Sequence, residues 1–236
     1  MEDAARLVGA PLWVEGRDFE LVPDGGGALV YQSWQSRQSL RGLQNGFSVP
    51  GITLGLRGNH QRLNAAVACA CLDLLDAQGL KVSPESLRAG LAGVQWEGRL
   101  EEVARDPTVL VDGAHNPAAA AALVQALDAL YPGRSVRLVF GILGDKERGP
   151  ILRALVPRAA RVYLARPHNV RGLDPKHYED EVRKLCPEVQ LYGSIPEALA
   201  AARTEQSSSP SEKLILATGS LTVVGEVKGA LTGRNR

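Results

Sequence analysis

The fold of this chain is decided by one stretch, residues 109–117, VLVDGAHNP. A short β-branched, apolar run ends there in an acid, a glycine, a histidine and an asparagine, and an alanine-rich helical pattern follows at once. Asn116 suits the N-cap of a helix, and Pro117 suits its first position. The pattern predicts a strand that turns directly into a helix, with Asp112 and His115 in the turn between them.

Such a strand-to-helix turn is a place where open α/β sheets bind ligands. The N-terminus of the following helix favours anions such as phosphate. Asp112 and Asn116 alone would explain a capped turn without any further role. The convergence of an acid and a histidine on one turn favours a functional site instead.

Strand and helix patterns alternate from Thr108 onward. Strands are predicted at 109–111, 136–140, 162–165, 189–192 and 214–217, and helices at 117–130, 150–156, 175–185, 196–203 and 223–231. Regular alternation implies right-handed βαβ crossovers. The predicted fold class is therefore α/β, a Rossmann-like, mainly parallel sheet with flanking helices. A polar stretch at 204–212 predicts a surface loop.

The region before this sheet has a different pattern, which predicts a separate α+β part. Short β-like runs at 12–14, 19–22, 28–31 and 52–54 alternate with turns and predict antiparallel hairpins. A helix follows at 61–77, with an apolar stripe of Leu63, Val67, Ala70 and Leu74. A second helix opens at Ser83 and ends near Gly93.

The composition is that of a soluble globular protein. The chain has 236 residues, is 44% hydrophobic and 22% charged, and carries a net charge of +1. This balance gives no general reason to expect nucleic-acid or membrane binding. Three cysteines are too few and too badly spaced for a zinc site or a disulfide framework. No apolar run approaches transmembrane length and the N-terminus is acidic, so we expect a cytoplasmic protein.

Polar side chains follow four of the predicted parallel strands, and parallel strands end at one edge of a sheet. Loops are polar in any case, but this collection suits an anionic ligand. The residues are Asp112 and His115, then Asp145 and Lys146, then His168 and Arg171, and finally Thr218, Gly219 and Ser220.

Six motifs, in order and at matching spacing, resemble those of folylpolyglutamate synthases and dihydrofolate synthases of the Mur ligase superfamily. They are HQRLNAA (60–66), WEGRLE (96–101), DGAHNP (112–117), GILGDKE (141–147), Arg171-Gly172 and GSLTV (219–223). The resemblance implies that residues 1–97 are the tail of the central, ATP-binding domain. It implies that residues 98–236 are the C-terminal, amino-acid-binding domain.

The glycine-rich phosphate loop with which this family begins is missing. Such a loop needs Gly-Lys followed by Ser or Thr, which together hold phosphates and magnesium. None of the six lysines follows a glycine, and the triple glycine at 25–27 lies among hairpin strands. We therefore expect the C-terminal portion of a ligase, lacking the N-terminal region and inactive alone. Whether it is a cloned piece, a proteolytic fragment or a natural short protein stays open.

The resemblance implies a nucleotide site. Asn64 matches the adenine-binding residue, with His60 nearby, and an asparagine amide can pair with the adenine edge. Asp112 matches the acid that accepts from the ribose. Arg99 matches the arginine that reaches the γ-phosphate, and His115 matches a histidine near the nucleotide. Alternatively, Asn64 lies on a helix face without any functional role, and Arg99 only forms a surface salt bridge.

The resemblance also implies a glutamate site. Lys146 and Ser220 match residues near the carboxylate of the incoming amino acid, and Asp145 and Arg171 join them as substrate-binding residues. Alternatively, Lys146 only belongs to a solvated charged turn, and Ser220 is only the N-cap of a helix. The residues assigned to catalysis are Arg99, His115 and Lys146.

The implied reaction uses ATP and Mg²⁺ to join L-glutamate to a folate or dihydropteroate carboxylate through an acyl phosphate. The C-terminal domain would deliver glutamate and close over ATP, which excludes water. The magnesium ligands are expected in the missing region, so no metal ligand is assigned to this chain.

Two other interpretations stay open. One is a Mur-type ligase that acts on another carboxylate, and the other is a non-catalytic protein that binds glutamate or nucleotide. The pterin acceptor, and whether the enzyme has one activity or two, also stay open. We expect a monomer in which residues 1–95 alone are aggregation-prone, while residues 99–236 fold alone.

Overall fold

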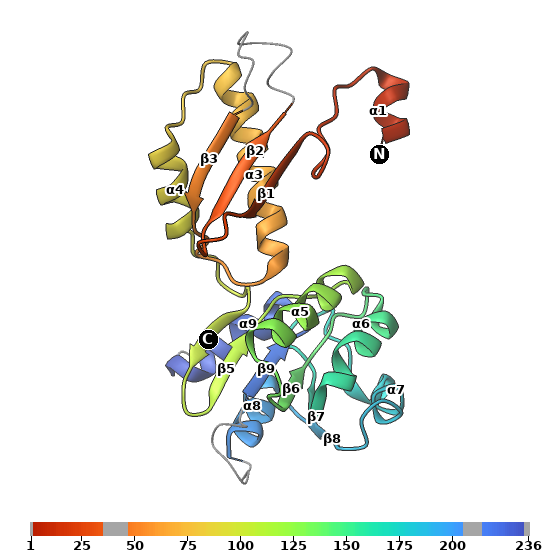
Figure 1. Cartoon of the computed structure of the whole chain (residues 1–236). Helices are drawn as coiled ribbons and strands as arrows, with labels where there is room; N and C mark the ends of the chain where they lie inside the picture. Colours follow the sequence, from red (N-terminus) through yellow and green to blue (C-terminus); the bar gives the residue numbers. More distant parts are fainter. Residues whose placement is uncertain (1, 35–46, 205–213, 234–236) are drawn as a thin grey trace. The chain divides into compact units, whose positions relative to one another are not determined.

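The structure, a computed structural model, describes residues 2–34, 47–204 and 214–233 (Figure 1). The chain divides into two compact units, Met1–Gln95 and Trp96–Arg236. The boundary expected from the sequence lies after residue 97, which is two residues beyond the boundary in the structure. The loop predicted at 204–212 lies, apart from its first residue, outside the described residues.

The first unit is built on an antiparallel sheet of order β1-β2-β3. Its elements are α1 (Glu2–Val8), β1 (Phe19–Pro23), β2 (Leu29–Ser33), β3 (Phe47–Ile52), α3 (Asn59–Ala77) and α4 (Pro84–Gly93). The predicted hairpins and both predicted helices are confirmed. The predicted strand at 12–14 is wrong, because the chain turns there: the Asp18 carboxylate accepts the Val14 N–H at 2.7 Å. The run predicted at 52–54 belongs to β3 only through Ile52.

Helix α3 packs on the sheet through small side chains. Ala66, Cys69 and Ala70 are buried with apolar side chains of the three strands. The predicted core stripe is wrong in its three large members, since Leu63, Val67 and Leu74 are 43%, 50% and 37% exposed. Small side chains let the helix approach the sheet closely, so the face with alanine and cysteine became the packed one.

The second unit contains a six-stranded sheet of order β4-β5-β9-β6-β7-β8. The strands are β4 (Glu101–Ala104), β5 (Thr108–Val111), β6 (Val136–Phe140), β7 (Ala159–Ala165), β8 (Val189–Tyr192) and β9 (Leu214–Thr218). All neighbours are parallel except β4 and β5. The predicted α/β fold is confirmed. Strand β4 was not predicted, because a short acidic edge strand has no apolar alternation.

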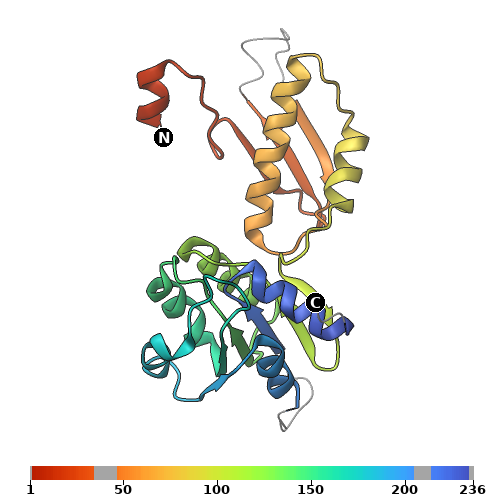
Figure 2. The same ribbon diagram turned by 180° about the vertical axis from the view of Figure 1, so that it is seen from behind.

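Helices cover both faces of this sheet (Figures 1 and 2). They are α5 (Pro117–Leu130), α6 (Arg148–Leu155), α7 (Glu179–Arg183), α8 (Ile195–Thr204) and α9 (Leu221–Thr232), with 3₁₀ turns at Val156–Arg158 and Pro175–His177. One core holds α5, α6 and α7 against the sheet, and a second holds α8 and α9. The helix predicted at 175–185 is instead a 3₁₀ turn and the short α7, because Asp174 caps the turn through the Lys176 N–H.

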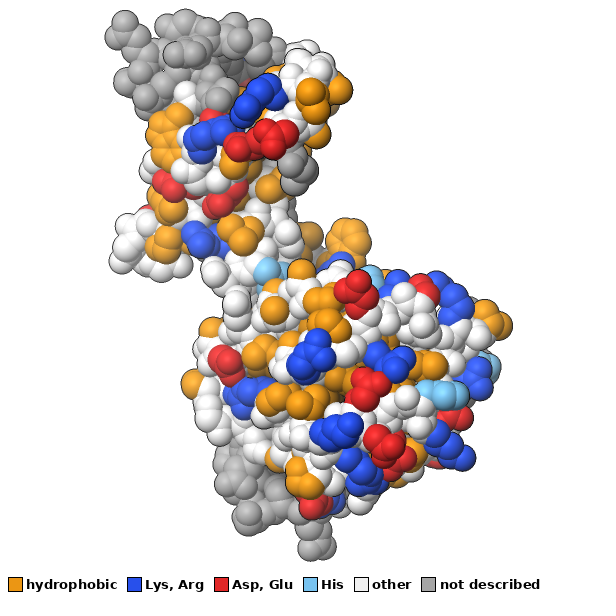
Figure 3. Space-filling model, turned by 90° about the vertical axis from the view of Figure 1, so that its right-hand side faces the viewer, with side chains coloured by type: hydrophobic (Ala, Val, Ile, Leu, Met, Phe, Trp, Pro, Cys, Tyr) orange, Lys and Arg blue, Asp and Glu red, His pale blue; other side chains and the backbone are white. Residues whose placement is uncertain are grey.

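The outer side of α6 and α7 carries mixed charges of both signs (Figure 3). An ion pair between Arg148 and Glu181 at 2.8 Å joins these two helices. Exposed pairs of this kind contribute little to stability. Among the described residues, no helix is long and apolar enough to cross a membrane.

Candidate functional site

The turn after β5 has the predicted form. Asn116 caps α5 by accepting the Ala119 N–H at 2.8 Å, and Pro117 occupies the first helical position. The predicted N-cap is therefore confirmed. The preceding residues, from Asp112 to His115, lie at the carboxyl end of β5, next to the end of β9, where the Asp112 N–H donates to the Ala217 carbonyl.

The Asp112 carboxylate is buried and holds two backbone segments together. One oxygen accepts the Leu100 N–H and the other accepts the Ala114 N–H, each at 2.8 Å. In parallel, the Gly113 N–H donates to the Gly98 carbonyl at 2.8 Å. These bonds tie the turn at 98–100 to the end of β5.

Arg99 lies at the centre of that tied turn. Its neighbour Leu100 has a φ of 45°, which is uncommon for a residue with a side chain and is held by the bond to Asp112. Glu97 and Glu101 pair with Lys228 rather than with Arg99. The half-buried Arg99 guanidinium makes no ion pair with the described residues, so the salt-bridge alternative is not what the structure shows.

Replacing Asp112 by asparagine tests this role. The amide loses one of two charged acceptors, so either the Leu100 or the Ala114 N–H stays buried and unpaired. We expect the free energy of unfolding to fall by about 2–3 kcal/mol in urea denaturation followed by circular dichroism. Asp128→Asn, which alters an exposed pair with Arg158, is the control and should change it by less than about 1 kcal/mol. Equal loss in both variants would contradict the role of Asp112.

His115 is oriented by the same turn. Its Nδ1 lies 2.8 Å from the Gly113 carbonyl oxygen and therefore donates a proton to it. In the neutral ring, Nε2 then carries the lone pair and can accept a hydrogen bond from a ligand.

A charged group of three residues lies where the loops after β6 and β7 meet. Asp145 Oδ2 lies 3.2 Å from Lys146 Nζ and 3.3 Å from Arg171 Nη1. The hydrogen bond from Lys146, helped by the charge of Arg171, lowers the pKa of Asp145 below its usual value. The Gly144 N–H also donates to the Arg171 carbonyl at 2.8 Å. Two cations share one carboxylate, so a ligand carboxylate can compete for them.

Ser220 is a buried N-cap. Its Oγ accepts the Val223 N–H at 3.2 Å at the start of α9. The capping alternative is therefore present in the structure. A hydroxyl that accepts one bond still has its proton to donate, so capping and ligand binding are compatible.

Asn64 and His60 belong to the first unit, at the start of α3. Asn64 is exposed and donates to the Gln61 Oε1 at 3.0 Å, while His60 Nε2 lies 3.1 Å from the Gln61 Nε2. Gln61 is buried and orients both, a role that sequence reasoning missed. The available signal was its place between them in the motif HQRLNAA.

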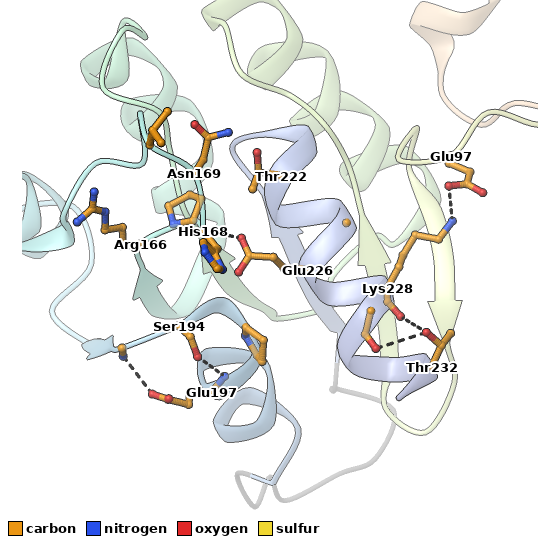
Figure 4. Close-up of a pocket in the computed structure, with 16 residues that line it drawn as sticks. Glu97, Arg166, His168, Asn169, Ser194, Glu197, Thr222, Glu226, Lys228 and Thr232 are labelled. Atoms are coloured by element: carbon orange, nitrogen blue, oxygen red, sulfur yellow. Dashed lines mark hydrogen bonds and ion pairs between the residues drawn. The ribbon is translucent and has the colours of Figure 1, made fainter. Parts of the chain in front are cut away.

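A large groove of the second unit lies elsewhere, along α9, α8 and the loop after β7 (Figure 4). Its volume is about 1490 Å³, and of the polar residues predicted at the sheet edge only His168 lines it. The His168 N–H donates to Glu226 at 2.8 Å, and burial raises the pKa of Glu226 above its usual value. Lys228 is neutralised by Glu97 and Glu101. Three glutamates line the groove together with one lysine and one arginine, so its lining does not favour an anion.

No group of three histidine, cysteine or acidic side chains that could hold a metal ion occurs in the part of the chain that the structure describes. Its three cysteines are free thiols, two of them buried. The candidate site therefore offers nitrogen and hydroxyl groups as hydrogen-bond donors, together with the carboxylates of Asp112 and Asp145.

Comparison with known proteins identifies relatives of this chain. The family "Mur ligase, glutamate ligase domain" matches residues 98–221. The folylpolyglutamate synthase of Lacticaseibacillus casei is 31% identical over 240 residues, which are 98% of this chain and 52% of that protein. The matched part covers between 20% and 52% of the length of the curated relatives.

Solved structures similar to this chain match it over nearly all of its length. Mycobacterium tuberculosis folylpolyglutamate synthase complexed with ADP and AMPPCP has a TM-score of 0.77 at 28% identity, covering 99% of this chain and 52% of that one. E. coli FolC in complex with DHPP and ADP has a TM-score of 0.80 at 26% identity, covering 99% and 50%.

Proposed function

Because the chain belongs to the Mur ligase family through its glutamate ligase domain, we propose that it is the C-terminal portion of an ATP-dependent ligase. This ligase joins L-glutamate to a folate or dihydropteroate carboxylate and acts as a monomer in the cytoplasm. Residues 1–97 are the tail of its central, ATP-binding domain, and residues 98–236 are its amino-acid-binding domain. The relatives named folylpolyglutamate synthase support this assignment.

One observation carries the proposal for the second unit, the two cations that share the Asp145 carboxylate. Lys146 and Arg171 hold the carboxylate of the incoming glutamate, in exchange for part of their pairing with Asp145. Arginine and lysine bind carboxylates through charge-assisted hydrogen bonds. Ser220 adds a hydroxyl at the N-terminus of α9, which favours negative charge.

Nucleotide contacts are assigned within each unit separately, two residues in the first and three in the second. Asn64 and His60, oriented by Gln61, contact the adenine. Asp112 accepts from the ribose, in addition to holding the turn at 98–100, and His115 lies near the nucleotide. The ADP and AMPPCP in a solved relative support a nucleotide. Mg²⁺ accompanies ATP, but the described residues contain no fitting ligand set, so no metal ligand and no step through the metal is assigned to them.

The reaction proceeds in two balanced steps. The acceptor carboxylate attacks the γ-phosphorus of ATP, giving an acyl phosphate and ADP. The glutamate amine then attacks the acyl carbon, the C–O bond to phosphate breaks, and the amine loses a proton as the amide forms. Arg99 neutralises charge on the transferred phosphoryl group, and Lys146 and Arg171 orient the amine by fixing the glutamate carboxylate.

Replacing Lys146 by alanine separates binding from chemistry. A lost charged hydrogen bond costs about 1.5–3 kcal/mol, so we expect the KM for glutamate in the complete ligase to rise about 10- to 100-fold, with a smaller change in kcat. Lys176→Ala, at an exposed lysine of another loop, is the control and should leave both constants unchanged. An unaltered KM for glutamate in the Lys146 variant would remove this residue from the glutamate site.

The function itself is tested by the attachment of labelled glutamate to a reduced folate in the presence of MgATP. The chain alone is compared with the complete ligase that contains it. We expect attachment by the complete ligase and none by the chain alone. If the complete ligase attaches no glutamate to any folate, the proposed substrates are wrong. If the chain alone is active, a phosphate site exists in it that the sequence did not reveal.

A further inference from the structure

Helix α9 begins with a leucine that lies on two turns of the candidate site. Leu221 is the first helical residue after the N-cap Ser220. A Cβ added at Gly113 would lie 2.5 Å from Leu221 Cδ2, and a Cβ added at Gly98 would lie 3.6 Å from the same methyl group. The Leu221 side chain therefore packs on both glycines, one in the turn at 98–100 and the other in the turn after β5.

The contact with Leu221 explains why residue 113 is a glycine. The φ of Gly113 lies outside the left-handed region, so its backbone conformation is open to residues with a side chain. Apart from Leu221, the nearest atom to an added Cβ is the Gly98 carbonyl oxygen at 3.6 Å, which is an ordinary contact distance. It is therefore the leucine that excludes a side chain at this position.

Burial does not explain why a leucine occupies this position. Leu221 is 59% exposed, so much of its apolar surface gains nothing from folding. Val224, three residues later on the same side of α9, is buried in the core and would lie 3.0 Å from a Cβ added at Gly98. Two residues of one helix face thus contact the turn that carries Arg99, and only Val224 is also a core residue.

The two turns carry residues assigned above to the nucleotide and to phosphoryl transfer. Arg99 directly follows Gly98, and His115 donates to the Gly113 carbonyl. We propose that Leu221 is a positioning residue, whose side chain holds the two turns together so that Arg99 and His115 keep the orientation that phosphoryl transfer requires. This inference rests on the proposed function, but the first of its two tests does not require activity.

The first test combines Gly113→Ala and Leu221→Ala, singly and together, in the full chain. Its readout is hydrogen exchange of the Leu100 amide, which donates to the buried Asp112 carboxylate. Gly113→Ala should speed this exchange by about ten-fold, because the leucine or the turn has to move. In the double variant the alanine methyl occupies the space that the leucine leaves, so exchange should be slower than in Gly113→Ala. Effects that simply add would mean that the contact does not exist.

The second test measures glutamate attachment by the complete ligase. Leu221→Ala should lower kcat about 10- to 100-fold, because small displacements of positioned groups have effects of this size. The KM for glutamate should change little, since Lys146 is untouched. Leu221→Met nearly conserves the side-chain volume and should restore most of kcat. Leu130→Ala is the control, because Leu130 is an exposed leucine at the far end of α5, and it should leave both constants unchanged.

The outcomes separate the positioning role from the proposed function. An unchanged kcat in Leu221→Ala would overturn the positioning role, as would a methionine variant as slow as the alanine variant. A complete ligase that attaches no glutamate to any folate would contradict the proposed function, and the positioning role with it. In that case a double variant that exchanges more slowly than Gly113→Ala would still show the contact between α9 and the two turns.

Discussion

Replacing Gly219 by alanine is expected to lower the free energy of unfolding of the second unit by about 4 kcal/mol. Gly219 has a φ of 110°, a conformation that costs residues with a side chain about 1–3 kcal/mol. An added Cβ would also lie 2.4 Å from the Gly141 carbonyl oxygen and 2.9 Å from the Phe140 ring. Phe140 and Gly141 lie at the end of the neighbouring strand β6. The backbone would have to move to relieve these two contacts, and overpacking of this kind costs about 1–3 kcal/mol more.

The matched control for this substitution is Gly225→Ala in α9. No atom lies within 4 Å of a Cβ added at Gly225, and alanine in a helix is preferred over glycine by about 1 kcal/mol. The free energy of unfolding measured by urea denaturation should therefore fall in Gly219→Ala and rise in Gly225→Ala. Hydrogen exchange of the β9 amides would locate the loss in the second unit. A Gly219→Ala variant as stable as the unaltered chain would mean that the turn after β9 does not lie against β6 as described.

The α/β unit was predictable because its strands are mainly apolar blocks with turn or helix-capping residues after them. The β5–α5 turn is the best example, since Asn116 and Pro117 determine it locally. Strand β4 was not predictable, because a four-residue run that begins with two glutamates forms an edge strand only when β5 is present to pair with it. Local signals therefore determined the central elements, and tertiary contacts determined the edge.

The packing of α3 could not be predicted for a different reason. The helix carries two apolar faces, and its sequence does not say which of them meets the three-stranded sheet. The large residues Leu63, Val67 and Leu74 suggested the wrong one, because burial depends on the partner present as well as on hydrophobicity.

The edge of the sheet was predictable as the place of the candidate site, but the bonds within it were not. Asp112 accepts from Leu100, twelve residues earlier, and Asp145 pairs with Arg171, twenty-six residues later. Such contacts depend on the strand order β5-β9-β6-β7, which alternation of strands and helices alone does not give.

Replacing Arg99 by alanine in the complete ligase is expected to lower kcat on the order of 10²–10³-fold. A positioned cation that stabilises the transferred phosphoryl group contributes an effect of at least this size in comparable reactions. The geometry supports such positioning: two hydrogen bonds to the end of β5 flank the turn, and the neighbouring glutamates pair with Lys228. In the proposed role Arg99 acts on phosphoryl transfer, so the KM for glutamate should change little.

The control is Arg105→Ala, which removes an exposed arginine paired with Glu102 at 2.7 Å. Exposed pairs of this kind contribute at most about 1 kcal/mol to stability. Arg105 directly follows the edge strand β4, so kcat should stay unchanged. The test rests on which constant changes in each variant, kcat or the KM for glutamate. Loss of kcat at Arg99 together with a raised glutamate KM at Lys146 would separate the two halves of the reaction. If Arg99→Ala instead raised only the glutamate KM, Arg99 would belong to the amino-acid site, and the phosphoryl group would have to be neutralised from outside this chain.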